Sequence, residues 1–398
     1  LIGGATTSRI HTAVKISPQM AENTPVIHVL DASRAVPVAQ NLLTADKKDE
    51  FAATIKQEYE NLRIDHAQKQ ADKKLITLAD ARANRVQIDW ENTSITKPQF
   101  IGNQYFVEYD LSELAKYIDW TPFFQTWELA GKFPAILEDE VVGKEATKLY
   151  ADAQKMLAKV VNEKLFTAKA AIGFYPCNAV GDDIEVYTDE TRSQVLTTLC
   201  HLRQQNQKAK NLPNFCLSDF IAPKESGKID YIGGFAVTSG IGMQPLVDKL
   251  KAELDDYNAI ILQALADRLA EAFAERMHER VRKEFWGYAP TENLDNELLI
   301  AEKYLGIRPA PGYPACPDHT EKWKLFSLLD ATAHTEITLT ESLAMYPAAS
   351  VSGWYFAHAD SKYFGLGKVA KDQIIDYAQR KGMEVSEVER WLGSVLGY

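Results

Sequence analysis

The chain of 398 residues is poor in cysteine and has no long apolar run. No stretch approaches the roughly 18 uninterrupted apolar residues that a membrane span needs, so we expect no membrane association. A signal peptide and an initiator methionine are also lacking, and we expect a cytoplasmic protein whose sequence starts inside a larger unit. The four cysteines form no CxxC pair, which argues against a disulfide framework and indicates a reducing compartment; they are Cys177, Cys200, Cys216 and Cys316.

Positive charge is also scarce. The formal net charge is −11, and no basic arm or stripe is present, which argues against binding to nucleic acid. Acidic proteins of this kind commonly bind small molecules or other proteins. With 46% hydrophobic and 25% charged residues the composition is that of a globular protein, and the length predicts two or three domains.

The motifs of several common catalytic and cofactor sites are missing as well. The sequence has no GxSxG elbow and no P-loop. Cys316 and His319 have C-x-x-H spacing, but the chain has no second half of a zinc site, so we expect no metal centre. The string GLGKVA (residues 365–370) matches a dinucleotide pattern, but the 28 residues after it are too few for the returning strand and acidic ribose ligand. We interpret it as a turn that enters a helix.

The pattern of predicted elements changes along the chain. Residues 1–54 resemble the last strand–helix units of an α/β domain, with an apolar strand over residues 25–30. Residues 55–74 are predicted as a helix end followed by a charged linker, because residues 66–74 contain no apolar side chain beyond alanine. In residues 75–398 strands and helices occur in groups, which predicts an α+β fold.

Individual elements of the larger part are predicted from periodicity and turn signals. A helix of about twenty residues is expected after Gly143. A second is expected over residues 245–286, where apolar side chains recur at mostly four-residue spacing, and a third over residues 371–391 with a break near Gly382. The Gly-Asp-Asp string at residues 181–183 predicts a tight hairpin. Strands are expected at residues 104–109, 170–176, 183–187, 214–223, 231–237 and 351–358.

The string RPAPGYPACPDH (residues 308–319) is the least ordinary stretch. Its four prolines exclude a helix or a central strand, so we expect a stiff extended loop. Arg308 has a planar fork suited to a carboxylate, Gly312 lets the backbone approach closely, and Tyr313 offers an aromatic face. Glu302 could accept from an ammonium or a ribose hydroxyl. Such a loop suits a small zwitterion, whereas a rigid connector with Arg308 in an ordinary salt bridge is the simpler interpretation of the composition.

This loop resembles the R-x-x-x-G-Y signature of the activation domain of cobalamin-dependent methionine synthase. Further strings that resemble this family follow in order along the chain: YIDWTPFF, ILEDEVVG, DETR, DYIGGFAVT, ALADRLAEAFAE, HERVRK, FWGYAP, SVSGWYF and VERWL. The resemblance implies that residues 75–398 form a C-shaped α+β domain around a twisted antiparallel sheet with long helices. It also implies that residues 1–54 are the C-terminal remnant of a Rossmann-like cobalamin-binding domain.

The resemblance further implies a set of binding residues. S-adenosylmethionine would be held by Arg308 at its carboxylate, by the backbone of Ala310 at the adenine or ribose, and by Asp119 at the ammonium group. The same pocket would include Gly312, Tyr313, Tyr363, Phe364, Glu302 and Glu271. Phe364 departs from a Tyr-Tyr pair of the family and lacks one hydroxyl.

Cobalamin would lie near a second group of residues. Asp31 stands where the family usually has asparagine, and His319 matches a histidine that faces the displaced axial histidine of the cobalamin domain. The other implied positions near the cofactor are Gly4, Ala5, Thr6, Ala32 and Ser33. No catalytic side chain is implied, because the cofactor carries the reactivity.

The family's activity is a methyl transfer from methyltetrahydrofolate to homocysteine through cobalamin. After oxidation to cob(II)alamin, an electron from flavodoxin or a similar reductase and a methyl group from S-adenosylmethionine restore the cofactor. The implied partners are the upstream cobalamin, folate and homocysteine modules of the same enzyme and the reductase, with the chain itself a monomer. This chain lacks those modules, so we expect no full turnover. The alternative is a non-catalytic interaction module that docks the reductase and the cobalamin domain.

Overall fold

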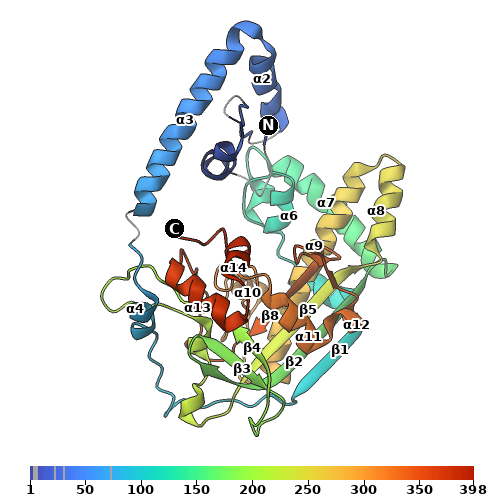
Figure 1. Cartoon of the computed structure of the whole chain (residues 1–398). Helices are drawn as coiled ribbons and strands as arrows, with labels where there is room; N and C mark the ends of the chain where they lie inside the picture. Colours follow the sequence, from blue (N-terminus) through green and yellow to red (C-terminus); the bar gives the residue numbers. More distant parts are fainter. Residues whose placement is uncertain (3–7, 22–23, 30–31, 72–73) are drawn as a thin grey trace. The chain divides into compact units, whose positions relative to one another are not determined.

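The computed structural model describes residues 1–2, 8–21, 24–29, 32–71 and 74–398 (Figure 1). The chain divides into two compact units, Leu1–Leu75 and Ile76–Tyr398. No helix of the described residues is long and apolar enough to cross a membrane.

The first unit consists mainly of helices. A short helix α1 (Arg9–His11), a π-helical turn (Thr12–Ile16) and a 3-10 turn (Ser17–Gln19) precede α2 (Ala32–Leu43) and α3 (Ala45–Ala71). Helix α3 continues through Ala71, so most of the charged segment that we predicted as a linker is helical. The segment is rich in alanine, glutamine and lysine, which are strong helix formers, and this explains the difference.

Over the described residues 25–29, the predicted strand at residues 25–30 forms a single parallel bridge, between Ile2 and His28. The Ile2 N–H donates to the Ile27 carbonyl (2.9 Å), and the Val29 N–H donates to the Ile2 carbonyl (2.8 Å). The buried hydroxyl of Tyr59, on α3, accepts from the His28 N–H (2.8 Å) and ties the helix to this bridge. The assignment of this unit to a Rossmann-like cobalamin-binding domain stays a prediction.

The second unit is built on a six-stranded antiparallel sheet in the order β4-β3-β2-β5-β8, with β1 paired to β2 beside β3. The long strand β2 pairs with β1 over its first half, with β3 over its last four residues, and with β5 along its other edge. The antiparallel pairing confirms the predicted sheet. The strands are β1 (Gly102–Tyr109), β2 (Thr167–Val180), β3 (Asp183–Tyr187), β4 (Val195–Cys200), β5 (Asp230–Ile241) and β8 (Ser350–Tyr355), with a small separate pair β6 (Thr338–Leu339) and β7 (Met345–Tyr346).

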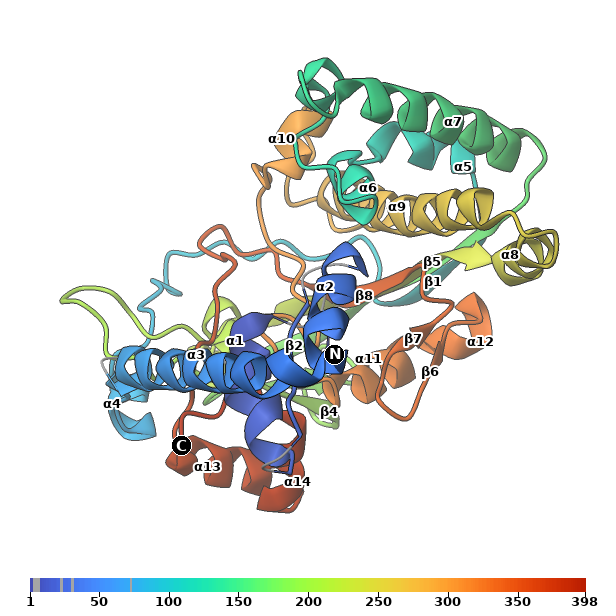
Figure 2. The same cartoon turned by 90° about the horizontal axis from the view of Figure 1, so that it is seen from above.

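Helices cover both faces of this sheet (Figure 2). Strand side chains alternate between the faces. Ile172 and Phe174 of β2 pack in one apolar cluster with the helices α7 and α9, whereas Ala171 and Tyr175 pack in a second cluster with α11. The helices are α4 (Leu78–Ala83), α5 (Leu111–Leu114), α6 (Thr121–Thr126), α7 (Gly143–Asn162), α8 (Met243–Ala252), α9 (Asp256–Arg280), α10 (Asn296–Ile300), α11 (Glu321–Leu329), α12 (Ala331–Thr335), α13 (Lys371–Lys381) and α14 (Val385–Trp391). Long helices and an antiparallel sheet together confirm the α+β class.

In the second unit, two predicted elements differ from the structure. The helical region at residues 245–286 is split, because Leu254 takes a left-handed conformation (φ +60°) and the Asp255 side chain caps the start of α9 by accepting from the Asn258 N–H (3.1 Å). The strand predicted at residues 214–223 is wrong. A 3-10 turn, Leu217–Phe220, replaces it, and the carboxylate of Asp219 accepts from the Cys216 N–H (2.9 Å) within that turn.

Candidate ligand-binding site

A cavity of about 500 Å³ lies beside β8 and α9. Its walls come from helix α9, from the proline-rich loop, from strands β5 and β8, and from the segment that follows β8. Seven residues predicted from the sequence line it: Glu271, Glu302, Arg308, Ala310, Tyr313, Tyr363 and Phe364. The structure therefore brings together residues that are up to 93 positions apart, from Glu271 to Phe364.

The start of the proline-rich loop is fixed by the edge of the sheet. Ile307 and Phe356 exchange both backbone hydrogen bonds (3.0 Å each), and the Trp354 N–H donates to the Pro309 carbonyl (2.8 Å). A Cβ atom on Gly353 would lie 2.7 Å from that carbonyl, so β8 needs glycine where the loop approaches. Proline is tolerated here because Pro309 needs only its carbonyl for this pairing. The loop thus extends the sheet and presents Arg308 at a defined position.

Gly312 has a local role in this loop and does not line the cavity. Its φ is +96°, and a Cβ atom there would lie 2.3 Å from Cε1 of His319. The close approach that Gly312 permits is therefore to the His319 ring, which is half-buried. The Lys322 ammonium lies 3.2 Å from Nδ1 of His319, and burial together with this charge lowers the pKa of the imidazole.

Arg308 is the most constrained side chain of the site. Its Nη2 donates to Oε2 of Glu275 (2.6 Å), and its Nη1 donates to the Tyr304 hydroxyl (2.9 Å) and to Nδ1 of His278 (3.2 Å). Burial disfavours the guanidinium charge, but Glu275 and Tyr304 hold the pKa of Arg308 above its ordinary value. The buried salt bridge matches the connector interpretation of the sequence, and the cavity position of Arg308 matches the ligand interpretation.

The aromatic pair after β8 is tied to the loop. The Tyr363 hydroxyl accepts from the Arg308 backbone N–H (3.0 Å) and lies 3.1 Å from the Tyr304 hydroxyl. Phe364 stacks on Phe215 with ring centroids 5.6 Å apart. An apolar contact thus anchors the second ring.

Two exposed carboxylates give the cavity its charge. Glu271 projects from α9, and Glu302 follows α10 in a left-handed conformation (φ +54°). Because Arg308 is already paired with Glu275, the side chains around the cavity carry a net negative charge. A cation is therefore favoured near this wall.

The remaining predicted residues lie elsewhere. Asp119 is half-buried and does not line the cavity, and its Oδ1 accepts from the Thr121 N–H (2.9 Å) at the start of α6. Ala32 and Ser33 begin α2 in the first unit. The predicted residues Gly4, Ala5 and Thr6, and also Asp31, fall outside the described residues.

Sequence reasoning missed three side chains of the Arg308 environment: Glu275, His278 and Tyr304. Glu275 and His278 follow Glu271 on α9 at spacings of four and seven residues, and Tyr304 precedes Arg308 by four. This helical spacing from Glu271 is the signal for Glu275 and His278 that the sequence contains.

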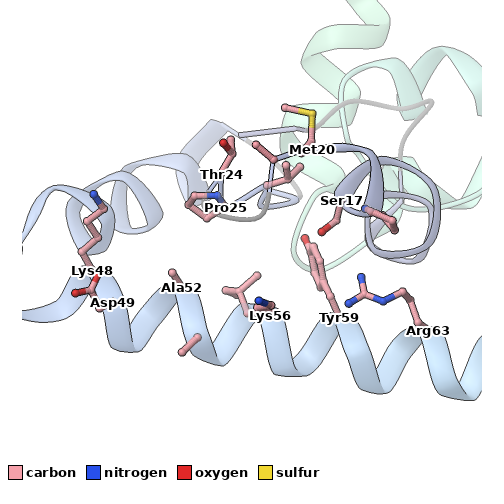
Figure 3. A pocket seen from close by; sticks show the side chains of 15 residues that line it. Ser17, Met20, Thr24, Pro25, Lys48, Asp49, Ala52, Lys56, Tyr59 and Arg63 are labelled. Atoms are coloured by element: carbon pink, nitrogen blue, oxygen red, sulfur yellow. The ribbon is translucent and has the colours of Figure 1, made fainter.

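A larger cavity of about 800 Å³ lies in the first unit (Figure 3). Lys56, Tyr59 and Arg63 of α3 form one wall, and Ser17 and Pro25 belong to the opposite wall. It contains none of the predicted site residues. Within the described part of the chain, no group of three or more histidine, cysteine, aspartate or glutamate side chains could hold a metal ion.

Comparison with known proteins agrees with this architecture. Residues 110–382 match the model of the family described as vitamin B12 dependent methionine synthase, activation domain. A solved structure described as the MetH reactivation domain bound to AdoHcy is 57% identical in sequence, with a TM-score of 0.80, and the match covers 81% of this chain and 99% of that chain. The chain therefore belongs to the family of activation domains of vitamin B12-dependent methionine synthase.

Proposed function

We propose that the second unit binds S-adenosylmethionine in the cavity beside β8 and supplies its methyl group for the reductive remethylation of cob(II)alamin. The observation that carries the proposal is the convergence of Arg308, two exposed carboxylates and four aromatic rings on one cavity. A related structure, 57% identical, contains AdoHcy, the demethylated form of this ligand.

Each part of the ligand has a matching group in the cavity. The carboxylate pairs with the guanidinium of Arg308. Glu271 and Glu302 face the positive sulfonium and ammonium groups. The flat adenine lies against the aromatic rings, of which Tyr313 is 60% exposed, and near the backbone of Ala310. Asp119 lies outside the cavity lining, and its contact with the ammonium group remains part of the proposal.

Methyl transfer from a sulfonium needs alignment of donor and acceptor but no general base. The cavity residues accordingly bind and orient the ligand. Cobalamin supplies the cobalt that accepts the methyl group. The residues proposed to lie near it, apart from His319, belong to the first unit or fall outside the described residues. Transfer of the methyl group to homocysteine is proposed to require the folate and homocysteine modules of the enzyme, and a flavodoxin-like reductase to supply the electron.

A second candidate function is a docking module without ligand binding. The observation that favours it is the Glu275 salt bridge, which already satisfies the charge of Arg308. Titration of the chain with S-adenosylmethionine separates the two functions, because only the first predicts binding.

The proposed function is tested by calorimetry on the full chain. Arg308→Ala should weaken the affinity for S-adenosylmethionine by at least ~1.5 kcal/mol, the value of a charged hydrogen bond. Arg308→Lys keeps a positive charge beside Glu275 but loses the planar fork. It should weaken binding without leaving the buried carboxylate of Glu275 uncompensated. Asp119→Asn tests the ammonium contact in the same assay.

Arg280→Ala is the matched control. This arginine pairs with Glu284 and does not line the cavity, so its loss should leave the affinity unchanged. If the wild-type chain bound no S-adenosylmethionine, the docking function would replace the proposed one.

A further inference from the structure

Only some of the N–H donors of the Arg308 guanidinium have hydrogen-bond acceptors among the described residues. A guanidinium has five N–H donors. Tyr304, His278 and Glu275 accept from three of them, two on Nη1 and one on Nη2. No described residue accepts from the Nε–H or from the second Nη2–H. Nε and Nη2 are neighbouring nitrogens of the guanidinium, and the Nε–H together with the Nη2–H on its side forms the parallel pair that binds a carboxylate bidentately.

The hydroxyl of Tyr304 determines how Tyr363 can interact. Tyr304 accepts from Nη1 of Arg308, Tyr363 accepts from the Arg308 backbone N–H, and the two hydroxyls are 3.1 Å apart. Tyr304 is 9% exposed, so its proton needs an acceptor inside the protein, whereas Tyr363 is 37% exposed and lines the cavity. Tyr304 therefore donates to Tyr363, and the proton of the Tyr363 hydroxyl is left for a ligand.

The charges of the surrounding groups fix these hydrogen-bond directions at neutral pH. Burial raises the pKa of Tyr304, so its hydroxyl stays protonated. Burial and the two neighbouring arginines, Arg282 and Arg308, keep the pKa of His278 well below its ordinary range, so His278 is neutral. Its Nδ1 can then accept only, because an arginine donates and never accepts.

We propose that Tyr304 and Glu275 are positioning residues that direct the unused donors of Arg308 and the hydroxyl of Tyr363 toward the carboxylate of an α-amino-acid ligand. Neither side chain lines the cavity, so both act through residues that do. The inference rests on the proposed S-adenosylmethionine site. The site is then selective for a ligand that carries a carboxylate, and Tyr304 and Glu275 produce this selectivity.

The test compares two ligands that differ in one group. The full chain is titrated calorimetrically with S-adenosylmethionine and with its decarboxylated analogue, which keeps the sulfonium, the amine and the adenosine. The wild type should bind S-adenosylmethionine more tightly. Tyr304→Phe should lower that affinity roughly tenfold, as expected for weakened hydrogen bonds to a charged group, and leave the affinity for the analogue unchanged. Arg308→Ala should remove the preference entirely.

Two further variants make the test specific. Glu275→Gln replaces a charged acceptor with a neutral one of the same shape and should reduce the preference in the same direction, which keeps the inference testable if Tyr304→Phe folds poorly. Tyr175→Phe is the control, because it removes another buried hydroxyl with two partners, Asn103 and the Leu328 carbonyl, away from the cavity. Its ratio of affinities should equal that of the wild type.

The outcomes separate this inference from the proposed function. An equal loss of affinity for both ligands in Tyr304→Phe, or an unchanged ratio, would overturn the positioning role. A wild-type chain that binds S-adenosylmethionine without preferring it to the analogue would also overturn it, while the proposed function would stand. Failure of the wild type to bind either ligand would refute the proposed function itself.

Discussion

Lys381 connects the end of the proline-rich loop to the C-terminal part of the chain. Its ammonium, at the end of α13, donates to Oδ2 of Asp318 (2.7 Å), to the Thr320 hydroxyl (2.6 Å) and to Oε1 of Glu321 (2.6 Å). The side chains of Lys381 and Asp318 are 5% exposed and that of Glu321 is fully buried. Lys381→Met would remove the charge that compensates two buried carboxylates while keeping most of the apolar volume.

The expected loss in the free energy of unfolding is about 3 kcal/mol. Removing one partner of a buried ion pair costs about 3–5 kcal/mol, because the other charge remains buried without compensation. The lower end applies here since both carboxylates keep other partners. Asp318 still accepts from the Tyr377 hydroxyl (2.7 Å), and Glu321 still accepts from Lys324 (2.9 Å).

Urea unfolding at two pH values measures this loss. Burial alone would raise the pKa of Asp318, but Lys381 and the surrounding donors hold it below its ordinary value. A depressed pKa contributes stability above the unfolded pKa of about 4, and this stability is lost as the pH falls through the folded pKa. The difference between wild type and Lys381→Met should therefore be full at pH 7 and should shrink as the pH falls below about 4.

The matched control lies on the same helix. Lys371 begins α13 and pairs with Glu389, but its side chain is 48% exposed. Lys371→Met should cost less than about 1 kcal/mol, as exposed pairs do. Equal losses for the two variants, or a loss for Lys381→Met that stays the same as the pH falls below about 4, would refute the electrostatic argument.

Two further predictions concern the loop and the units. Lys322→Met should raise the pKa of His319, because the Lys322 charge lowers this pKa whereas the Asp318 charge raises it. NMR titration of the His319 ring measures the change. An unchanged pKa would mean that the Lys322 charge does not contribute. A chain of residues 76–398 should bind S-adenosylmethionine as tightly as the full chain, because every residue that lines the cavity belongs to the second unit. A weaker affinity in calorimetry would show that the first unit contributes to the site.

Much of the fold followed from the sequence because its signals were local. The α+β class was evident from the grouping of strands and helices, and α7 begins at Gly143 as predicted. The hairpin at Gly181 and Asp182 joins β2 to β3 as the Gly-Asp-Asp string suggested. The strand predicted at residues 214–223 was wrong because its signal was burial alone. Its apolar residues fill the second core cluster, and burial does not distinguish a strand from a turn.

The site was predictable only in part. Loop composition pointed to Arg308, Tyr313 and Glu302 but left Arg308 in either of two roles. The family resemblance added Glu271, Ala310, Tyr363 and Phe364. Glu275, His278 and Tyr304 were missed because their contacts depend on how α9 packs against the sheet. No short string of sequence records that packing. A pairing of residues 30 or 33 positions apart, as for His278 and Glu275 with Arg308, becomes visible only in three dimensions.

The two interpretations of Arg308 left open by the sequence turn out to be compatible. An arginine free in a cavity would lose side-chain entropy on binding a ligand, whereas one already held on its Nη1 and Nη2 atoms has lost that entropy on folding. The salt bridge to Glu275 therefore does not compete with a ligand for the Nε–H and the second Nη2–H. The edge strand β8 likewise contributes to both stability and ligand recognition. Its pairing with residues 307–309 protects its backbone and fixes the position of Arg308. Stability and ligand recognition thus depend on the same contacts, so a variant that loosens the pairing of the loop with β8 should lose both together.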